Sequence, residues 1–396
     1  NCMKVLYISS LVSDKLFDIL YSKRLTTGFV GQKYHGLFVK GLSSADDDCE
    51  VIALSQPPIG KSFCRFKDVE LGIKFRYVPI VSIPLIKQLV YFIYTFIYTL
   101  YWCVKNIGEE KVIMSSLMRV YQYPPIWLGS CLFRCKQITI ACDVPWMTTV
   151  QVTTSKLSVK QRISIWLGKT MCGMFDGYVF LTDTMNDVLN PNKRPFIVVE
   201  GFCDQNMANV PNTLENKEGK RIIMYAGGLN HKYGIGNLVE AVKRLEDDSV
   251  ELWLYGLGDM NSSLRDGSSK NIKFKGPRSN EEVVSAELKA SVLINPRPTE
   301  DEYTRYSFPS KTLEYMASGT YTMTTRLAGI PSEYFDYCGV IDDYSAEGIA
   351  AALRETLKMS ASQLHEKGMA AKAFVLENKN NKKQAQRVIV FAHELK

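Results

Sequence analysis

The residues best suited to chemistry lie in one stretch, residues 307–319, which reads SFPSKTLEYMASG. Within it, Lys311, Glu314 and Ser318 are spaced i, i+3 and i+7, which places them on one face of a helix. Gly319 is a typical helix stop. A cation can attract an anionic group, and a carboxylate can accept hydrogen bonds from hydroxyl groups such as those of a sugar. The spacing therefore indicates a small polar binding site on an α-helix.

A strand and the start of this helix must position these side chains. Residues 292–296 form an apolar run that predicts a buried strand, and Arg297 follows directly. A polar loop then leads into the helix, where Ser307 or Ser310 can cap the first turn and Pro309 suits its start. The helix N-terminus favours an anion, and Arg297 would add positive charge beside it. An ordinary capped helix with solvated charges fits the same spacing.

The stretch resembles the donor-site signature of the retaining glycosyltransferases of family 4, which have the GT-B fold. Glu314 and Gly319 match the second glutamate and the glycine of that signature, whereas Tyr306 stands at its first glutamate. A subgroup of the family carries SFPSK and EYMASG in this form. The resemblance implies that Glu314 holds the ribose of a nucleotide-sugar, and we expect Lys311 and Arg297 to stabilise its diphosphate. The other expected donor contacts here are Ser307, Phe308, Pro309 and Ser310.

The length, composition and net charge limit the size and class of the protein. The chain has 396 residues, which suits two domains of roughly 200 residues. Hydrophobic residues make up 46% and charged residues 22%, values typical of a globular protein. The net charge of +7 suits anionic partners such as nucleotide diphosphates or a membrane surface. We expect an acceptor-side domain at 1–202, joined by a crossing helix at 378–396, and a donor domain at 203–377.

The cysteine pattern indicates the cellular compartment in which the protein is expected. Ten cysteines are scattered along the chain without a Cys-x-x-Cys pair, which predicts reduced thiols in a cytosolic protein. No signal peptide is evident, because a strand-like segment starts at Lys4. We therefore expect a cytoplasmic protein, with a peripheral position at the inner face of the membrane as an option.

The first half reads as a doubly wound parallel sheet. Strands are expected near residues 4–9, 50–54, 111–114, 137–141, 178–181 and 196–199, separated by helical stretches. Asp143 follows one of these strands, and strand ends line the crevice in such folds. The family resemblance implies a polar residue near this place that approaches the donor sugar, so Asp143 is a candidate catalytic residue. It could equally cap a turn before Pro145.

Residues 89–104 form an apolar and aromatic run that is 16 residues long. This is shorter than the roughly 20 residues that a membrane-spanning helix needs. A buried helix is the first interpretation. An interfacial helix that touches the bilayer is the second, supported by the tyrosine and tryptophan content and by Lys87 and Lys105 at the flanks.

The second half begins with an expected strand at 221–226, followed by Gly227 and Gly228, where a phosphate could approach the backbone closely. The two basic residues that the family usually shows in this region are absent, since Gly228 and Tyr233 stand in their places. Lys232 or Arg297 could supply the missing charge. The resemblance also implies that the nucleotide base lies against the loop that contains Arg278.

No convincing metal site is apparent. Asp46, Asp47 and Asp48 precede a strand rather than follow one, which favours a solvated turn. The expected donor chemistry needs no metal and no other cofactor. The chain also lacks a recognised nucleic-acid-binding module.

These observations predict an α/β protein of the GT-B class, with two Rossmann-like domains facing a cleft. The expected reaction moves a hexosyl group, with retention, from a UDP- or GDP-sugar to a hydroxyl of a glycan or lipid-linked acceptor in polysaccharide biosynthesis. Two other readings remain. A nucleotide-sugar 2-epimerase on the same fold would need extra acid–base residues, and the chain has only four histidines. A non-enzymatic peripheral membrane protein would use the 89–104 run and the basic C-terminal segment.

Overall fold

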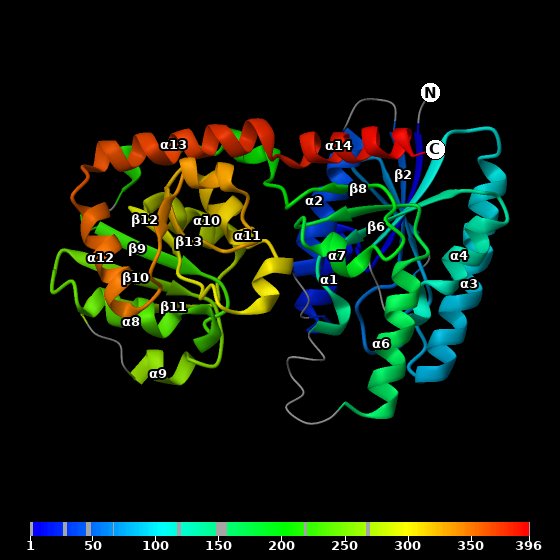
Figure 1. The fold of residues 1–396 in the computed structure, drawn as a ribbon, viewed down its shortest axis with the longest axis horizontal. Helices are drawn as coiled ribbons and strands as arrows, with labels where there is room; N and C mark the ends of the chain where they lie inside the picture. Colours follow the sequence, from blue (N-terminus) through cyan, green and yellow to red (C-terminus); the bar gives the residue numbers. More distant parts are fainter. Residues whose placement is uncertain are drawn as a thin grey trace. The chain divides into compact units, whose positions relative to one another are not determined.

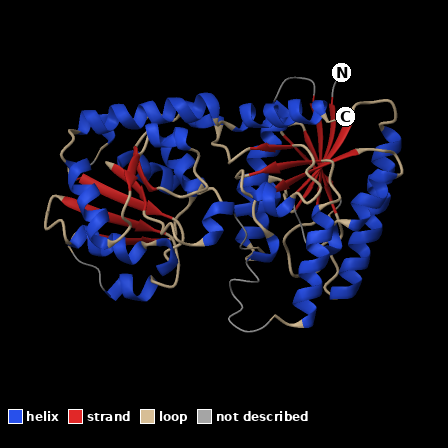
Figure 2. Cartoon of the chain, viewed as in Figure 1, coloured by secondary structure: helices blue, strands red, loops and turns tan. Residues whose placement is uncertain are grey.

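A computed structural model describes residues 3–26, 30–44, 49–65, 67–116, 120–147, 157–217, 219, 221–266 and 270–395. The aspartates at 46–48 lie outside these ranges. The chain separates into two compact units, residues 1–202 with 381–396 and residues 203–380. Each unit contains a β-sheet flanked by helices (Figures 1 and 2).

The sheet of the first unit has the strand order β3-β4-β2-β1-β5-β6-β7-β8. Neighbouring strands are parallel except at one edge, where β3 and β4 form an antiparallel pair. The predicted parallel sheet is therefore confirmed, and the antiparallel edge corrects it. The strands are β1 (Met3–Ser9), β2 (Cys49–Ser55), β3 (Lys67–Glu70), β4 (Ile73–Tyr77), β5 (Lys111–Ser116), β6 (Lys136–Ala141), β7 (Gly177–Phe180) and β8 (Phe196–Val198).

The two faces of this sheet are covered by different helices, and β1 shows how its residues divide between them. Val5 and Tyr7 pack into the core formed with α2 and α14, whereas Leu6 and Ile8 pack into the core formed with α3 and α4. This alternation is the period of two that a strand buried on both faces requires. The helices are α1 (Asp14–Ser22), α2 (Val30–Ser44), α3 (Pro84–Lys105), α4 (Pro124–Cys131), α6 (Val159–Cys172), α7 (Met185–Leu189) and α14 (Asn381–Glu394).

The second unit contains a parallel sheet with the strand order β11-β10-β9-β12-β13-β14. Its strands are β9 (Arg221–Ala226), β10 (Val250–Tyr255), β11 (Ile272–Gly276), β12 (Val292–Asn295), β13 (Tyr321–Thr325) and β14 (Gly339–Ile341). Its helices are α8 (Ile235–Lys243), α9 (Asn261–Asp266), α10 (Asn280–Lys289), α11 (Ser310–Ser318), α12 (Ala346–Leu357) and α13 (Ala361–Asn378).

Helix α11 corresponds to the helix expected from the 307–319 stretch. It ends at Gly319, whose φ of +82° is the left-handed conformation that glycine adopts without strain. Its N-terminus differs from the expectation. Pro309 occupies the N-cap position, and neither Ser307 nor Ser310 caps the first turn with its side chain. The cap that the sequence suggested is thus absent.

The segment expected as a crossing helix, 378–396, contains the helix α14. Helix α13 ends at Asn378 in the second unit, and α14 begins at Asn381 and packs against α2 in the first unit. Gln384 fixes α14 there, because its side-chain amide donates to the backbone carbonyl of Gly201 over 3.0 Å.

Helix α3 covers the 89–104 run and extends it to 22 residues. One side of α3 is buried and contains Tyr91 and Trp102, and the other side exposes several apolar residues. In the described parts of the chain, no helix has both the length and the apolarity to cross a bilayer.

Candidate functional site

In the second unit, the loops after three strands approach one another closely at the carboxyl edge of the sheet. Gly234, in the loop after β9, has a φ of +78°, and a Cβ there would lie 2.2 Å from the carbonyl oxygen of Pro296, just after β12. Gly256, directly after β10, has a φ of +126°, and a Cβ there would lie 1.8 Å from the carbonyl oxygen of Gly227. These backbone contacts allow no side chain at either glycine, so they hold the three loops together.

Arg297 lies between two aromatic rings in this region. Its guanidinium carbon is 4.6 Å from the ring centre of Tyr233 and 5.2 Å from that of Tyr303. Both distances fit cation–π contacts. The Nε atom of Arg297 and the hydroxyl of Tyr303 are buried, and neither has a hydrogen-bond partner among the described residues. Buried donors are normally satisfied, so this pair is the most conspicuous polar feature of the loops.

The glycine loop meets the same aromatic side chain. A Cβ on Gly228 would lie 2.9 Å from the ring of Tyr233, and the Nζ atom of Lys232 is 5.1 Å from its centre. Gly227 is held by its N–H, which donates to the carbonyl of Tyr255 over 2.9 Å. The structure thus brings Gly228, Lys232 and Arg297 together around Tyr233. From the sequence, Tyr233 is notable only because it replaces a basic residue of the family, so its contacts are an additional finding.

Lys311 and Glu314 contact each other on α11. The Lys311 Nζ atom lies 3.1 Å from a Glu314 carboxylate oxygen. Burial disfavours the ammonium, but Glu314 and then Glu287 outweigh it and raise the pKa of Lys311 above its usual value. Lys311 is therefore charged at neutral pH. The positive charge at the helix start already has a carboxylate beside it, so the need for a bound anion does not follow from charge balance alone.

Tyr315 joins α11 to the glycine loop. Its buried hydroxyl accepts a hydrogen bond from the N–H of Ala226 over 2.8 Å and donates to the carbonyl of the same residue over 3.2 Å. Ala226 is the last residue of β9, directly before Gly227. Tyr315 therefore fixes the helix that contains Glu314 beside the glycine loop. We did not anticipate this role, because an apolar helix face does not reveal which partner a tyrosine hydroxyl will have.

The residues that lead into α11 divide into two anchors and two more open positions. Phe308 is buried, with its ring centre 5.4 Å from that of Tyr334, and Pro309 is also buried. Ser307 is half-buried, and Ser310, the first residue of the helix, is exposed. The two apolar residues hold the loop in place, and the serines are accessible at the start of the helix.

The remaining predicted site residues are Arg278 and Asp143. Arg278, after β11, is exposed, and its Nε atom is 3.9 Å from Glu282. It lines a pocket of about 500 Å³ together with Trp253 and Lys275. Asp143 belongs to the first unit, where it follows β6 and remains exposed. The pKa of its carboxyl is raised because surrounding residues shield it in part from water.

No metal centre is assembled in the part of the chain that the structure describes: no three side chains of His, Cys, Asp or Glu gather as ligands would. Metal independence remains a prediction to test by chelation.

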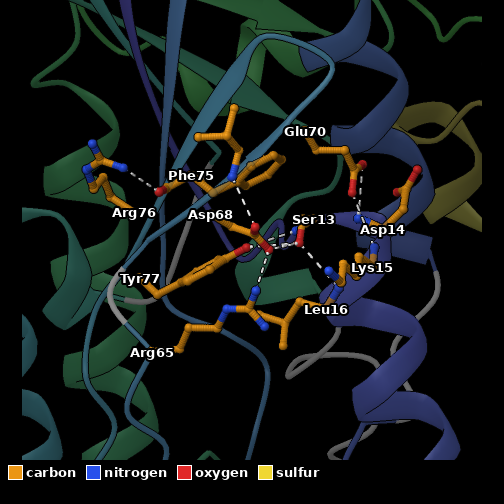
Figure 3. Close-up of polar contacts among 11 residues, drawn as sticks. Ser13, Asp14, Lys15, Leu16, Arg65, Asp68, Glu70, Phe75, Arg76 and Tyr77 are labelled. Carbon is orange, nitrogen blue, oxygen red and sulfur yellow. Dashed lines mark hydrogen bonds and ion pairs between the residues drawn. The ribbon is translucent and has the colours of Figure 1, made fainter.

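A helix start in the first unit, that of α1, is filled by protein side chains, as Figure 3 shows. At α1, the Ser13 hydroxyl accepts from the N–H of Leu16 over 3.2 Å. The carboxylate of Glu70, on β3, accepts from the amides of the first two residues of α1, Asp14 at 3.2 Å and Lys15 at 3.3 Å. These contacts satisfy the amides that an anion would otherwise bind.

Comparisons with known proteins include a family model that matches most of the second unit. Residues 220–359 match the family described as Glycosyl transferases group 1. The putative colanic acid biosynthesis glycosyl transferase WcaI of Escherichia coli K12 is 25% identical over 184 residues, which cover 43% of this chain and 44% of WcaI. The match therefore spans less than half of that relative.

Solved structures resemble the whole chain. Sucrose-phosphate synthase from Thermosynechococcus elongatus has a TM-score of 0.66 at 12% identity, with 99% of each chain covered. HepE from Anabaena, solved in complex with UDP, has a TM-score of 0.63 at 11% identity, covering 99% of this chain and 100% of HepE. These similarities confirm the predicted GT-B fold. Together with the family match and the curated relative, they support a glycosyltransferase enzyme.

Proposed function

We propose that the protein moves a hexosyl group, with retention, from a UDP- or GDP-sugar to a hydroxyl of a glycan or lipid-linked acceptor. The observation that carries the proposal is Arg297, which is held between two tyrosine rings beside the glycine loop. Its buried Nε donor has no partner among the residues that the structure describes. A guanidinium with an unused donor suits an oxyanion such as a phosphate. The donor diphosphate is the ligand that this arrangement fits best.

The charges on these loops match what sugar transfer requires. When the bond between the anomeric carbon and the diphosphate oxygen breaks, the electron pair stays on the leaving oxygen and its negative charge grows. Arg297, Lys311 and the first amides of α11 would stabilise that charge. Glu314 would accept hydrogen bonds from the ribose hydroxyls. Asp143 would approach the sugar from the first unit, and Arg278 would contact the base. This scheme uses no metal.

The finer points rest on the relatives. A bound UDP in the structure of HepE supports a uridine nucleotide, and the name of WcaI supports a role in polysaccharide biosynthesis. The family resemblance of the 307–319 stretch supports retention at the anomeric carbon. We propose a cytoplasmic reaction on this basis.

The test begins with a panel of nucleotide sugars and thermal unfolding. A ligand at about 100 times its dissociation constant stabilises a protein by about 2.7 kcal/mol, so the true donor should raise the melting temperature clearly. Release of nucleoside diphosphate from that donor, with and without excess EDTA, then reports turnover. Transfer should survive EDTA; loss of activity that Mg²⁺ or Mn²⁺ restores would contradict the metal-free scheme. A product that is only the epimer of the donor would identify an epimerase instead.

A further inference from the structure

The outer side of α3 carries a continuous apolar stripe. Leu89, Ile93, Ile97 and Tyr101 are spaced four residues apart, so they lie along one side of the helix, and each is about half exposed or more. The residues that face the sheet are different ones, among them Tyr91 and Trp102. The stripe therefore adds nothing to the core of the first unit.

Helix α6 shows the same property more strongly. Cys172 is its one buried residue, and Trp166 is 64% exposed. Ile163, Trp166 and Leu167 follow Val159 by four, seven and eight residues, so the four side chains lie on one side of the helix, and all are exposed. A capping box at Ser158 stabilises the N-terminus of this helix. An isolated amphipathic helix with this composition is suited to a surface outside the protein.

The two helices lie on the same face of the sheet. Helices α3, α4 and α6 each contact the short 3-10 helix η1 (Val120–Gln122), whereas α2 and α14 pack on the opposite face. In Figure 1 the three helices stand together on the side of the first unit away from α14. Leu128 and Leu132, at the end of α4, add further exposed apolar area between them.

The charged side chains on α3, α4 and α6 are all basic. None of α3, α4 and α6 contains an aspartate or a glutamate. Exposed basic side chains accompany the apolar residues; they are Lys105, Arg134, Lys160, Arg162 and Lys169. The acidic residues Glu109 and Glu110 follow the C-terminal end of α3 and are not on the helices.

We propose that α3 and α6 dock together on an anionic phospholipid surface, with the apolar side chains in the headgroup region and the basic ones among the lipid phosphates. Helices that bind at a membrane interface combine exposed apolar residues, tryptophan or tyrosine, and cations. Helices α3 and α6 show this combination, with Trp166 and Tyr101 exposed and no carboxylate on either helix. The binding is peripheral, because no described helix can span the bilayer. It does not depend on the proposed transfer reaction.

Vesicle flotation of the full chain tests the proposal. The protein should float with phosphatidylcholine vesicles that contain phosphatidylglycerol and much less with phosphatidylcholine alone. Replacing two charges, Lys160→Gln with Arg162→Gln, should weaken binding roughly thirtyfold, since each cation near such a surface contributes about one kcal/mol. The pair Leu89→Ser and Ile93→Ser should weaken it about tenfold or more.

Controls separate this result from unfolding. Both double variants should keep the melting temperature of the unaltered protein, because the replaced side chains are exposed. Val390→Ser, an exposed change on α14 at the opposite face, should leave flotation unchanged. The proposal is overturned if the unaltered protein fails to float with the anionic vesicles. It is also overturned if the variants float equally well, or if the apolar pair instead converts a dimer to a monomer while flotation stays unchanged.

Discussion

Two helix starts, one in each unit, differ in how their first amides are satisfied. At α1, Ser13 and Glu70 occupy the amides with side-chain oxygens, and Asp68 in turn accepts from the Ser13 hydroxyl over 2.6 Å (Figure 3). At α11, the N-cap residue Pro309 offers no side-chain hydrogen bond. The two units share an α/β architecture but differ in these local details. The closed start stabilises the fold, whereas the open start is available to a ligand.

Replacing Arg297 or Lys311, near the open helix start, should have the largest effect on turnover. Loss of one donor to the leaving group typically costs about 2.7–4 kcal/mol in the transition state, so Arg297→Gln and Lys311→Ala should each lower turnover by two to three powers of ten. Lys232→Ala should do less. The measurement is kcat for nucleoside diphosphate release.

Arg244→Gln is the matched control for the arginine change, because Arg244 makes an exposed ion pair with Glu347 at the far end of α8. If Lys232→Ala abolished turnover while Lys311→Ala was nearly neutral, the charge on the leaving group would come from the glycine loop.

A change of pH should alter the stability of the first unit through His35. Burial lowers the pKa of His35 from 6.5 to about 4, and its Nδ1 atom lies 2.5 Å from the Tyr7 hydroxyl. Because the unfolded chain binds the proton more readily, stability is complete above pH 6.5 and is lost as pH falls towards 4, by roughly 3 kcal/mol. Urea unfolding between pH 7 and 5 should show this slope. His35→Gln should flatten the slope, whereas the same change at exposed His231 should not.

Glu314→Gln should weaken donor binding. A hydrogen bond to a charged group contributes about 1.5–3 kcal/mol, so loss of the carboxylate charge should lower donor affinity roughly ten- to a hundredfold. Titration calorimetry with the donor nucleotide measures the change. Glu355→Gln is the control, since Glu355 makes a similar ion pair with Lys358, three residues away, on an exposed surface. If Glu314→Gln bound the donor as tightly as the unaltered protein, Glu314 would be a surface residue without a role in donor binding.

The smallest effect is expected at the filled helix start. Ser13→Ala removes a cap and the hydrogen bond to Asp68, which should lower the free energy of unfolding by about 1–2 kcal/mol. Donor affinity should not change. Ser22→Ala, at the other end of the same helix and exposed, should alter neither quantity by much. A fall in donor affinity for Ser13→Ala alone would show that α1 contributes to binding.

The sequence predicted the central strands and the donor helix because both have strong patterns. The apolar run at 221–226 coincides with β9, and Gly319 ends α11 as expected. In the β3–β4 hairpin, β4 alternates apolar and polar residues and was overlooked. Its partner β3 is an edge strand of mostly polar residues, Lys67–Glu70, without a clear apolar alternation. A pattern of hydrophobicity cannot reveal a strand that buries so little.

The environment of Arg297 could not be predicted for a different reason. Tyr233 and Tyr303, which hold its guanidinium, are separated in the sequence by three strands and three α-helices. Their contact follows from the packing of three loops and has no local signature. The position of Arg297 after a strand was predictable, but the two rings and the unpartnered donor were not.

The close backbone approach at Gly234 and Gly256 limits how such a site could change its donor. A side chain at either position would collide with a neighbouring carbonyl, so random mutagenesis there should yield mostly misfolded variants. Useful diversity must come from positions with room for new atoms, such as Ser310 at the helix start or Arg278 beside its pocket. A library aimed at a new sugar or nucleotide should therefore leave these glycines fixed and vary the open positions around them.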